Sequence, residues 1–310
     1  MEHSARIYVA GHNGLVGSAI RIKLEDHNYS NLLCCSKNEV DLRDTSAVQK
    51  FFEETKPEYV FLAAAKVGGI KANYSYPAEF IYDNLMIQAN IIHASYQYGV
   101  KKLLFLGSSC IYPKYCPQPI KEEYLLNGHL EETNEPYAIA KIAGIKMCQA
   151  YHKQYNTNFI SIMPSNLYGP NDHFDLENSH VLPALIRKFH DAQVNEADYV
   201  ELWGTGEPKR EFLYIEDLAD ACLFLMENYN DAGIINVGTG EDVTIKELAE
   251  VIKKITGFQG EIRWNHDVPD GTLQKLMNVD KINNLGWKAK VPLHEGISRT
   301  YQWFLKNHLH

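Results

Sequence analysis

The sequence lacks the long apolar runs, the leader and the cysteine pattern of membrane and secreted proteins. Its longest apolar stretches, such as residues 59–65, are far shorter than the roughly 20 residues that a bilayer span needs. No basic segment followed by an apolar one stands at the start, so we expect no signal peptide and a cytoplasmic protein. The six cysteines include no Cys-x-x-Cys pair, which predicts free thiols rather than a disulfide framework or a metal site.

The sequence also lacks an excess of basic residues. Its formal net charge of -9 argues against a nucleic-acid surface. An anionic small molecule is still compatible with this charge, because a phosphate needs only a few local donors. At 310 residues the chain is long enough for one large α/β domain or two closely joined ones.

The first half alternates between β-rich apolar runs and segments whose apolar residues have helical spacing. We expect strands over residues 6–10, 32–35, 59–63, 102–106 and 158–163, and helices over 15–26, 45–55, 79–98 and 136–154. This alternation predicts an α/β fold with a doubly wound parallel sheet of the Rossmann type. Later elements are expected over 182–192, 217–227 and 244–256, followed by a terminal helix over 293–306. We therefore expect a cofactor-binding domain over 1–165 and a smaller α/β substrate-binding domain over 166–310, with some later segments returning to the first sheet.

A glycine-rich loop follows the first expected strand and opens the first expected helix. Glycines in such a turn let the backbone approach a pyrophosphate, which then lies on the helix N-terminus. The spacing Gly-x-x-Gly-x-x-Gly is one residue longer than the common dinucleotide fingerprint. The position of the loop favours a cofactor site over an ordinary β–α turn. The residues assigned to this site are Gly11, His12, Asn13, Gly14, Leu15, Val16 and Gly17.

The second expected strand is followed by Ser36 and Lys37, with no acid before Glu39. An NAD site usually has Asp or Glu at this place, where the carboxylate binds the ribose 2′-hydroxyl. A hydroxyl and an ammonium suit a 2′-phosphate better, although Lys37 could instead be a solvated loop charge. We expect NADP(H) to be the cofactor.

A tyrosine and a lysine four residues apart begin the helix expected after the fourth strand, at Tyr137 and Lys141. They share one helical face, where the ammonium would lower the phenol pKa and hold the nicotinamide ribose. Ser108 follows the fourth strand, at the edge where doubly wound folds bind ligands. A serine there can hydrogen-bond a substrate oxygen beside Tyr137. Together with the glycine loop, these residues predict an enzyme.

At these motifs the chain resembles the extended short-chain dehydrogenases/reductases, and longer strings resemble the GDP-L-fucose synthase family among them. The resemblance covers nearly the whole chain. The strings that carry it span residues 62–70, 107–113, 134–141, 163–170, 178–181, 203–204, 210–213, 269–272 and 300–305.

The resemblance implies a bifunctional enzyme that inverts C3 and C5 of GDP-4-keto-6-deoxy-D-mannose and then reduces C4. Both inverted carbons adjoin the ketone, so their protons are acidic, and each inversion needs one group to remove a proton and another to return one. By resemblance this pair is Cys110 and His180, while Tyr137 protonates the C4 oxygen. Without these roles, Cys110 would be a small buried residue and His180 a structural histidine. Related dehydratases typically have Thr-Asp-Glu where this chain has Ser-Cys-Ile at residues 109–111, which argues against a dehydratase.

The resemblance also implies further contacts. For the cofactor these are Ser36, Lys37, Ala63, Ala64, Leu106, Gly107, Lys141, Pro164, Ser165, Asn166, Leu167 and His180, in addition to the glycine loop. For the substrate they are Ser108, Asn166, Lys188, Trp203, Arg210 and Asp270, with Lys188 and Arg210 near the diphosphate. Bacterial members carry arginine in the glycine loop and near the second strand, where this chain has Asn13 and Cys35.

Two other functions fit parts of the pattern. A sugar-nucleotide 4-epimerase with bound NAD would share Tyr137 and Lys141 but would not need Cys110 or His180. A non-catalytic NADP-sensing protein would be expected to have lost Tyr137 or Lys141, and both are present.

We also expect a homodimer. The two long helices expected over 79–98 and 136–154 carry apolar residues on more than one side, including Ile87, Ile91, Ile142 and Ile145. Such helices need a second partner, and the resemblance implies that they meet the same two helices of a second copy in a four-helix bundle.

Overall fold

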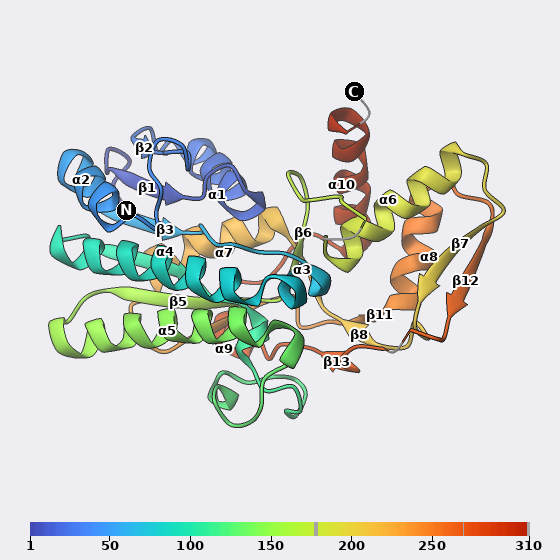
Figure 1. Cartoon of the computed structure of the whole chain (residues 1–310). Coiled ribbons are helices and arrows are strands. Elements are labelled where there is room, and N and C mark those ends of the chain that lie inside the picture. Colours follow the sequence, from blue (N-terminus) through green and yellow to red (C-terminus); the bar gives the residue numbers. More distant parts are fainter. Residues whose placement is uncertain (177–178, 269, 309–310) are drawn as a thin grey trace.

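A six-stranded parallel sheet forms the centre of the molecule (Figure 1). The computed structural model describes residues 1–176, 179–268 and 270–308. The strand order is β10-β5-β4-β3-β1-β2, and every neighbouring pair is parallel. The strands are β1 (Ile7–Ala10), β2 (Leu32–Leu33), β3 (Tyr59–Leu62), β4 (Lys102–Leu106), β5 (Phe159–Pro164) and β10 (Ile235–Val237).

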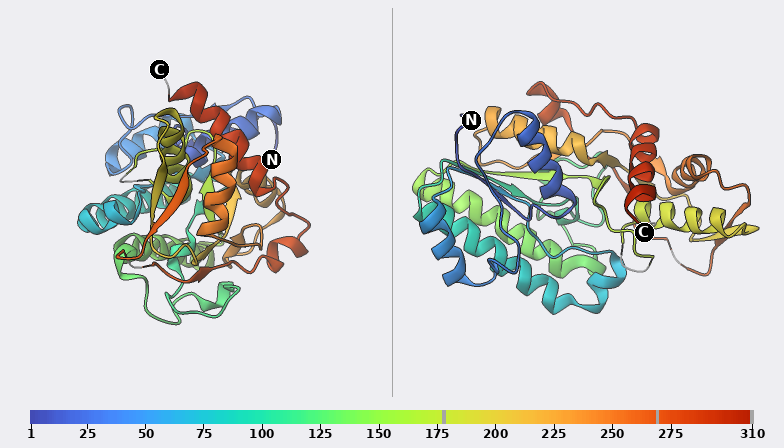
Figure 2. Two further views of the ribbon diagram at one scale, coloured as in Figure 1. Left: turned by 90° about the vertical axis from the view of Figure 1, so that its right-hand side faces the viewer. Right: turned by 90° about the horizontal axis from the view of Figure 1, so that it is seen from above.

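Helices cover both faces of this sheet (Figures 1 and 2). On one face α1 (Leu15–Asp26) packs against α7 (Ile215–Asn228). On the other face α4 (Pro77–Gln97) packs against α2 (Thr45–Thr55) and α5 (Glu135–Tyr155). The predicted doubly wound α/β fold is confirmed.

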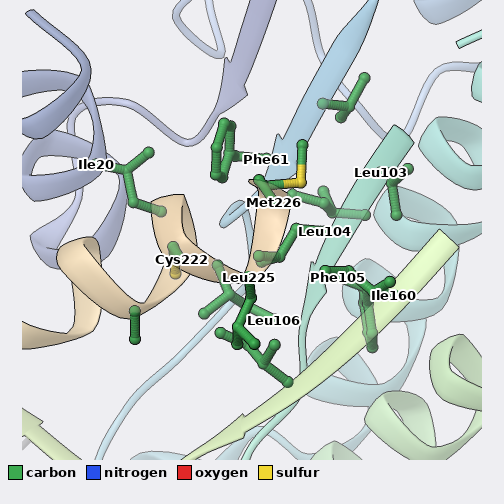
Figure 3. Packing of buried hydrophobic residues seen from close by; sticks show 14 of the residues in the cluster. Ile20, Phe61, Leu103, Leu104, Phe105, Leu106, Ile160, Cys222, Leu225 and Met226 are labelled. Carbon is green, nitrogen blue, oxygen red and sulfur yellow. The ribbon is translucent and has the colours of Figure 1, made fainter. Parts of the chain in front are cut away.

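Strand β4 shows how the sheet is buried between these layers. Its residues are all buried, as expected for a central parallel strand. Figure 3 shows Leu104 and Leu106 pointing toward α7, while Leu103 and Phe105 lie on the opposite side of the strand. A Cβ on Gly144 of α5 would overlap the Phe105 ring, so α5 approaches the sheet more closely there than any other residue would allow.

A second core lies in the C-terminal part of the chain, beside the carboxyl ends of the strands (Figure 1). Helices α6 (Val181–Val194), α8 (Ile245–Thr256) and α10 (Leu293–Asn307) contribute to it, with the paired strands β7 (Tyr199–Trp203) and β12 (Glu261–Asn265). The smaller elements nearby are β6 (Asn166–Tyr168), β8 (Lys209–Arg210), β9 (Phe212–Tyr214), β11 (Val243–Thr244), β13 (Gln274–Lys275) and α9 (Asp280–Asn284). Short helices also occur at Ile70–Ser75 (α3), Ser109–Ile111 (η1), Glu122–Tyr124 (η2) and Glu132–Asn134 (η3).

Most predicted elements are present, and the differences lie in short segments. The second strand ends at Leu33 rather than at residue 35, because its backbone pairs with β1 only at Leu32 and Leu33. Strand β10 pairs with β5, and α7 packs on α1, although both follow residue 165 in the chain. The division into domains at 165/166 stays a prediction. Among the described residues, no helix is both long enough and apolar enough to cross a bilayer.

Candidate active site

The glycine loop closes tightly at the carboxyl end of β1. Gly11 has a φ of +85°, a conformation that favours glycine, and a Cβ there would lie 2.8 Å from the backbone of Ala64. A Cβ on Gly17 would overlap the carbonyl oxygen of Gly11. These two positions therefore require glycine, so that α1 starts directly against the loop.

The N-terminus of α1 suits an anion. Gly14 is its N-cap, no side chain caps the helix, and its first turn contains no acidic residue. Asn13 and Gly14 are exposed, so the first N–H groups of the helix are open to a ligand. Backbone donors at a helix start, reached over glycines, fit the pyrophosphate of a dinucleotide.

The other predicted cofactor residues lie at the carboxyl ends of neighbouring strands. Ala63 and Ala64 follow β3, Leu106 and Gly107 end β4, and residues 164–167 end β5 and begin β6. The Ser165 hydroxyl is buried and has no hydrogen-bond partner in the described part of the chain. The amide of Asn166 instead donates to the Glu211 carbonyl at 2.7 Å.

At the second-strand loop the predicted phosphate contacts face an acid. The Ser36 N–H and hydroxyl both donate to the Glu39 carboxylate at 2.7 Å, and these hydrogen bonds lower the pKa of Glu39. Glu39 also lies within electrostatic range of His12 in the glycine loop. Ser36 therefore already binds a carboxylate. Of the two predicted phosphate contacts, Lys37 is the one for which no such hydrogen bond is seen among the described residues.

Ser108, Tyr137 and His180 line one small pocket of about 80 Å³, together with Val67, Gly68 and Asn73. Tyr137 comes from the first turns of α5 and Ser108 follows β4. His180 is the N-cap of α6 and is exposed, although loss of surrounding water lowers its pKa. Its neighbours Glu177 and Asn178 and, in another of the resembling strings, Pro269 lie outside the described residues.

Cys110 lies directly behind Ser108. It is buried in η1, and its backbone N–H donates to the Ser108 hydroxyl at 3.3 Å. Burial raises the pKa of the Cys110 thiol, while a hydrogen bond with Ser108 and the ammonium groups of Lys275 and Lys141 act in the opposite direction. Ser108 therefore lies next to both Cys110 and Tyr137, and it acts to lower the pKa of each group.

Lys141 lies beneath the tyrosine on α5. Its ammonium donates to the Leu106 carbonyl at 2.8 Å and lies 5.0 Å from the Phe105 ring centre and 5.8 Å from that of Tyr137. Burial lowers the pKa of Lys141 to about 8. Burial also raises the pKa of Tyr137. In the chain by itself burial has the largest effect on the Tyr137 pKa, and a lowering by Lys141 stays a prediction.

Four of the six predicted substrate residues form two pairs. Lys188 of α6 lies 5.1 Å from the ring centre of Trp203, whose side chain is 65% exposed at the end of β7. Arg210 lies within electrostatic range of Asp270, which accepts hydrogen bonds from the Thr205 N–H at 2.9 Å and hydroxyl at 2.6 Å. Burial lowers the pKa of Arg210. An exposed indole beside an ammonium, as at Trp203 and Lys188, and a separate guanidinium such as Arg210 are groups that suit a nucleoside diphosphate.

Several residues near the pocket were not among the predicted site residues. Val67 and Gly68 line the pocket and belong to the resembling string at 62–70, but they were given no role. Asn73 also lines the pocket and lies beyond that string, on helix α3, which was not predicted. Lys275 on β13 lies within electrostatic range of the Cys110 thiol, although the two residues are far apart in the sequence. No group of His, Cys, Asp and Glu side chains within the described ranges could hold a metal ion.

Comparisons with known proteins agree with this geometry. Residues 7–238 match the profile of the NAD dependent epimerase/dehydratase family. The chain is 58% identical to GDP-L-fucose synthase 1 of Arabidopsis thaliana, over 99% of this chain and 95% of the relative. It is 51% identical to GDP-L-fucose synthase of Escherichia coli strain K12, over 97% of each chain. Among solved structures, GDP-L-fucose synthetase of Naegleria fowleri bound to NADP superposes with a TM-score of 0.93 at 32% identity, over 99% of this chain and 95% of that one. The chain therefore belongs to the NAD dependent epimerase/dehydratase family and, within it, to the GDP-L-fucose synthases.

Proposed function

We propose that this protein converts GDP-4-keto-6-deoxy-D-mannose to GDP-L-fucose, by inversion of C3 and C5 followed by reduction of C4 with NADPH. The observation that carries the proposal is the grouping of Ser108, Tyr137 and His180 around one pocket, with the Cys110 thiol joined to it through Ser108. A reductase alone needs the serine and tyrosine. The thiol and the imidazole supply the additional acid–base groups that inversion requires.

Inversion begins with removal of a proton from a carbon beside the C4 ketone. The electrons move onto the ketone oxygen as an enolate, and a proton returned to the other face completes the inversion. Cys110 and His180 come from different segments, η1 and the start of α6, so two separate groups serve the pocket. Ser108 and Tyr137 have the donors to stabilise the enolate oxygen.

Reduction needs a hydride at C4 and a proton at its oxygen. The bound dihydronicotinamide supplies the hydride. Tyr137 supplies the proton, because a phenol is protonated at neutral pH and Tyr137 lines the pocket beside Ser108. Lys141, whose ammonium donates to the Leu106 carbonyl, is proposed to bind the nicotinamide ribose.

For the cofactor, we infer that NADPH is preferred and that Lys37 contacts the 2′-phosphate. The glycine loop and the uncapped start of α1 fit the pyrophosphate of either dinucleotide. Lys37 supports NADP, as does the NADP-bound relative from Naegleria fowleri. Glu39 would have to release Ser36 before Ser36 could bind the same phosphate.

The decisive assay is NADPH absorbance with GDP-4-keto-6-deoxy-D-mannose. Oxidation of one NADPH per GDP-L-fucose formed is the expected result. A 4-epimerase would interconvert sugars without net NADPH consumption, and a non-catalytic sensor would bind NADPH without turnover. Either result would overturn the proposed function.

We also propose a cytoplasmic homodimer. All six cysteines are free thiols, which suits a reducing compartment. Of the four isoleucines on which the dimer prediction rested, Ile91, Ile142 and Ile145 are buried within the chain itself and Ile87 is partly buried. These isoleucines therefore do not form the outer surface of the two helices, because α4 and α5 cover them against each other and against the sheet. The homodimer is supported instead by large apolar side chains that are exposed on the same two helices, Tyr82 on α4 and Ile139 on α5.

A further inference from the structure

Asn73 is a buried polar side chain in the wall of the active-site pocket. It lies on the short helix α3, and its side chain is 6% exposed. Its Nδ2 donates to the carbonyl oxygens of Gly68 at 2.8 Å and Gly69 at 3.0 Å. These bonds hold the glycine turn that enters α3.

The same two bonds fix which way the amide points. Carbonyl oxygens only accept hydrogen bonds, so the NH₂ group must face Gly68 and Gly69 and the Oδ1 atom must face away from them. This Oδ1 atom is buried and has no hydrogen-bond partner within the described residues. A buried acceptor without a donor is costly, and such groups often mark the place of a ligand.

The chemistry of the pocket limits what the donor can be. In the proposed substrate, C4 is a ketone, C6 is a methyl group and C1 carries the diphosphate. The sugar hydroxyls at C2 and C3 are therefore its available donors. C3 adjoins C4, the carbon that Tyr137 serves from the same pocket.

We propose that the Asn73 Oδ1 atom accepts a hydrogen bond from the 3-hydroxyl group of the substrate and so selects sugars that carry this hydroxyl. The inference rests on the proposed function. A site built around a hydroxyl rejects an analogue without it, because the buried acceptor then stays unpaired.

The test compares GDP-4-keto-6-deoxy-D-mannose with its 3-deoxy analogue. For the wild-type enzyme we expect kcat/KM to be about 10- to 100-fold higher with the hydroxylated sugar, the range for one buried hydrogen bond. In Asn73→Ala the ratio of the two kcat/KM values should fall toward the ratio set by the different reactivity of the two sugars. Because the comparison is a ratio, a general loss of activity from a disturbed glycine turn cancels.

Asn84 provides the matched control. It is 2% exposed and holds the adjacent loop, with Oδ1 accepting from the Lys66 N–H and Nδ2 donating to the Lys66 and Phe80 carbonyls. All of its groups are paired, so Asn84→Ala should lower kcat/KM for both sugars by the same factor. Equal treatment of the two sugars by the wild-type enzyme, or an unchanged ratio in Asn73→Ala, would overturn the inference. Failure of the proposed function is distinct, since the wild-type enzyme would then turn over neither sugar.

Discussion

Single substitutions in the pocket should affect the reduction at C4 and the inversion at C3 and C5 separately. Tyr137→Phe removes the proton donor for the C4 oxygen and leaves Cys110 and His180 in place. Reduction should fall by roughly two to four orders of magnitude, the usual range for a general acid–base group. Exchange of the C3 and C5 protons with deuterated solvent should continue. NADPH absorbance and mass spectrometry of the recovered sugar measure the two steps separately.

Cys110→Ser provides the complementary result. A serine keeps the shape of the side chain but is a much weaker acid than a thiol, so solvent exchange should collapse. Hydride transfer to the ketone that has not been inverted would then give a GDP-6-deoxy sugar of the wrong configuration. Deuterium incorporation at the wild-type rate would show that Cys110 is not an acid–base group and would favour a 4-epimerase.

Lys275 lies within electrostatic range of the Cys110 thiol and so affects its reactivity. The other charged or titratable groups near Lys275 are Arg210, Glu131 and Cys116. The Glu131 carboxylate is already paired with Lys114, 3.1 Å away. The Lys275 cation lowers the Cys110 pKa against the effect of burial, so Lys275→Met should raise that pKa further and reduce the thiolate fraction at neutral pH.

The measurement is alkylation of Cys110 by iodoacetamide as a function of pH, followed on the Cys110 peptide. Because the thiolate reacts, each unit of added pKa should slow the reaction at pH 7 about tenfold. Lys275→Arg keeps the cation and should preserve the wild-type profile. A profile that does not move in Lys275→Met would contradict this electrostatic role.

Cofactor choice is the third residue-scale prediction. Lys37→Asp replaces the proposed phosphate contact by an acid of the kind that NAD sites use. The KM for NADPH should rise more than the KM for NADH, as steady-state kinetics with both cofactors would show. Equal changes in the two values would mean that Lys37 does not contact the 2′-phosphate.

Among the elements, local signals separate what the sequence predicts from what it misses. Helix α2 has the predicted bounds, and its ends are set locally: Asp44 accepts from the Ser46 and Ala47 N–H groups at its start, and Lys56 ends it in a left-handed conformation. Strands β7 and β12 were missed because they are short and pair with each other across some 60 residues. Pairing at that distance leaves no local pattern to detect.

The same distinction holds for the site. Ser108, Tyr137 and Lys141 were predicted because strand ends and helical spacing place them. The orientation of Asn73 depends on two carbonyl groups in a turn, and the position of Lys275 depends on the pairing of β13 with β8. Neither arrangement has a signature in the sequence.

The close approach of α5 to the sheet leads to an element-scale prediction. A Gly→Ala change inside a helix is normally stabilising by about 1 kcal/mol. At Gly144 the new Cβ would overlap the Phe105 ring, so we expect Gly144→Ala to destabilise the protein by about 1–3 kcal/mol. Because α5 carries Tyr137 and Lys141, kcat should fall as well. Urea unfolding and steady-state kinetics measure both effects, and Lys146→Ala on the exposed side of α5 should change stability by no more than about 0.5 kcal/mol.

For the whole molecule, the question is whether α4 and α5 meet a second copy. The two helices lie side by side on one face of the sheet, with their outer surfaces away from it (Figure 1). Tyr82 on α4 is 60% exposed and Ile139 on α5 is 42% exposed. Large apolar side chains on two adjacent helices suit an isologous contact, in which each helix pair packs on its copy.

We therefore expect sedimentation equilibrium at micromolar concentration to give twice the chain mass of 35.4 kDa. The double variant Tyr82→Glu and Ile139→Lys would place charges in the contact on both copies, and it should shift the population toward monomers without unfolding the chain. Tyr115 is 86% exposed but lies outside both helices, so Tyr115→Glu should leave the dimer intact. A wild-type protein of monomeric mass would refute the dimer. A dimer that withstands the double variant would place the contact on another surface.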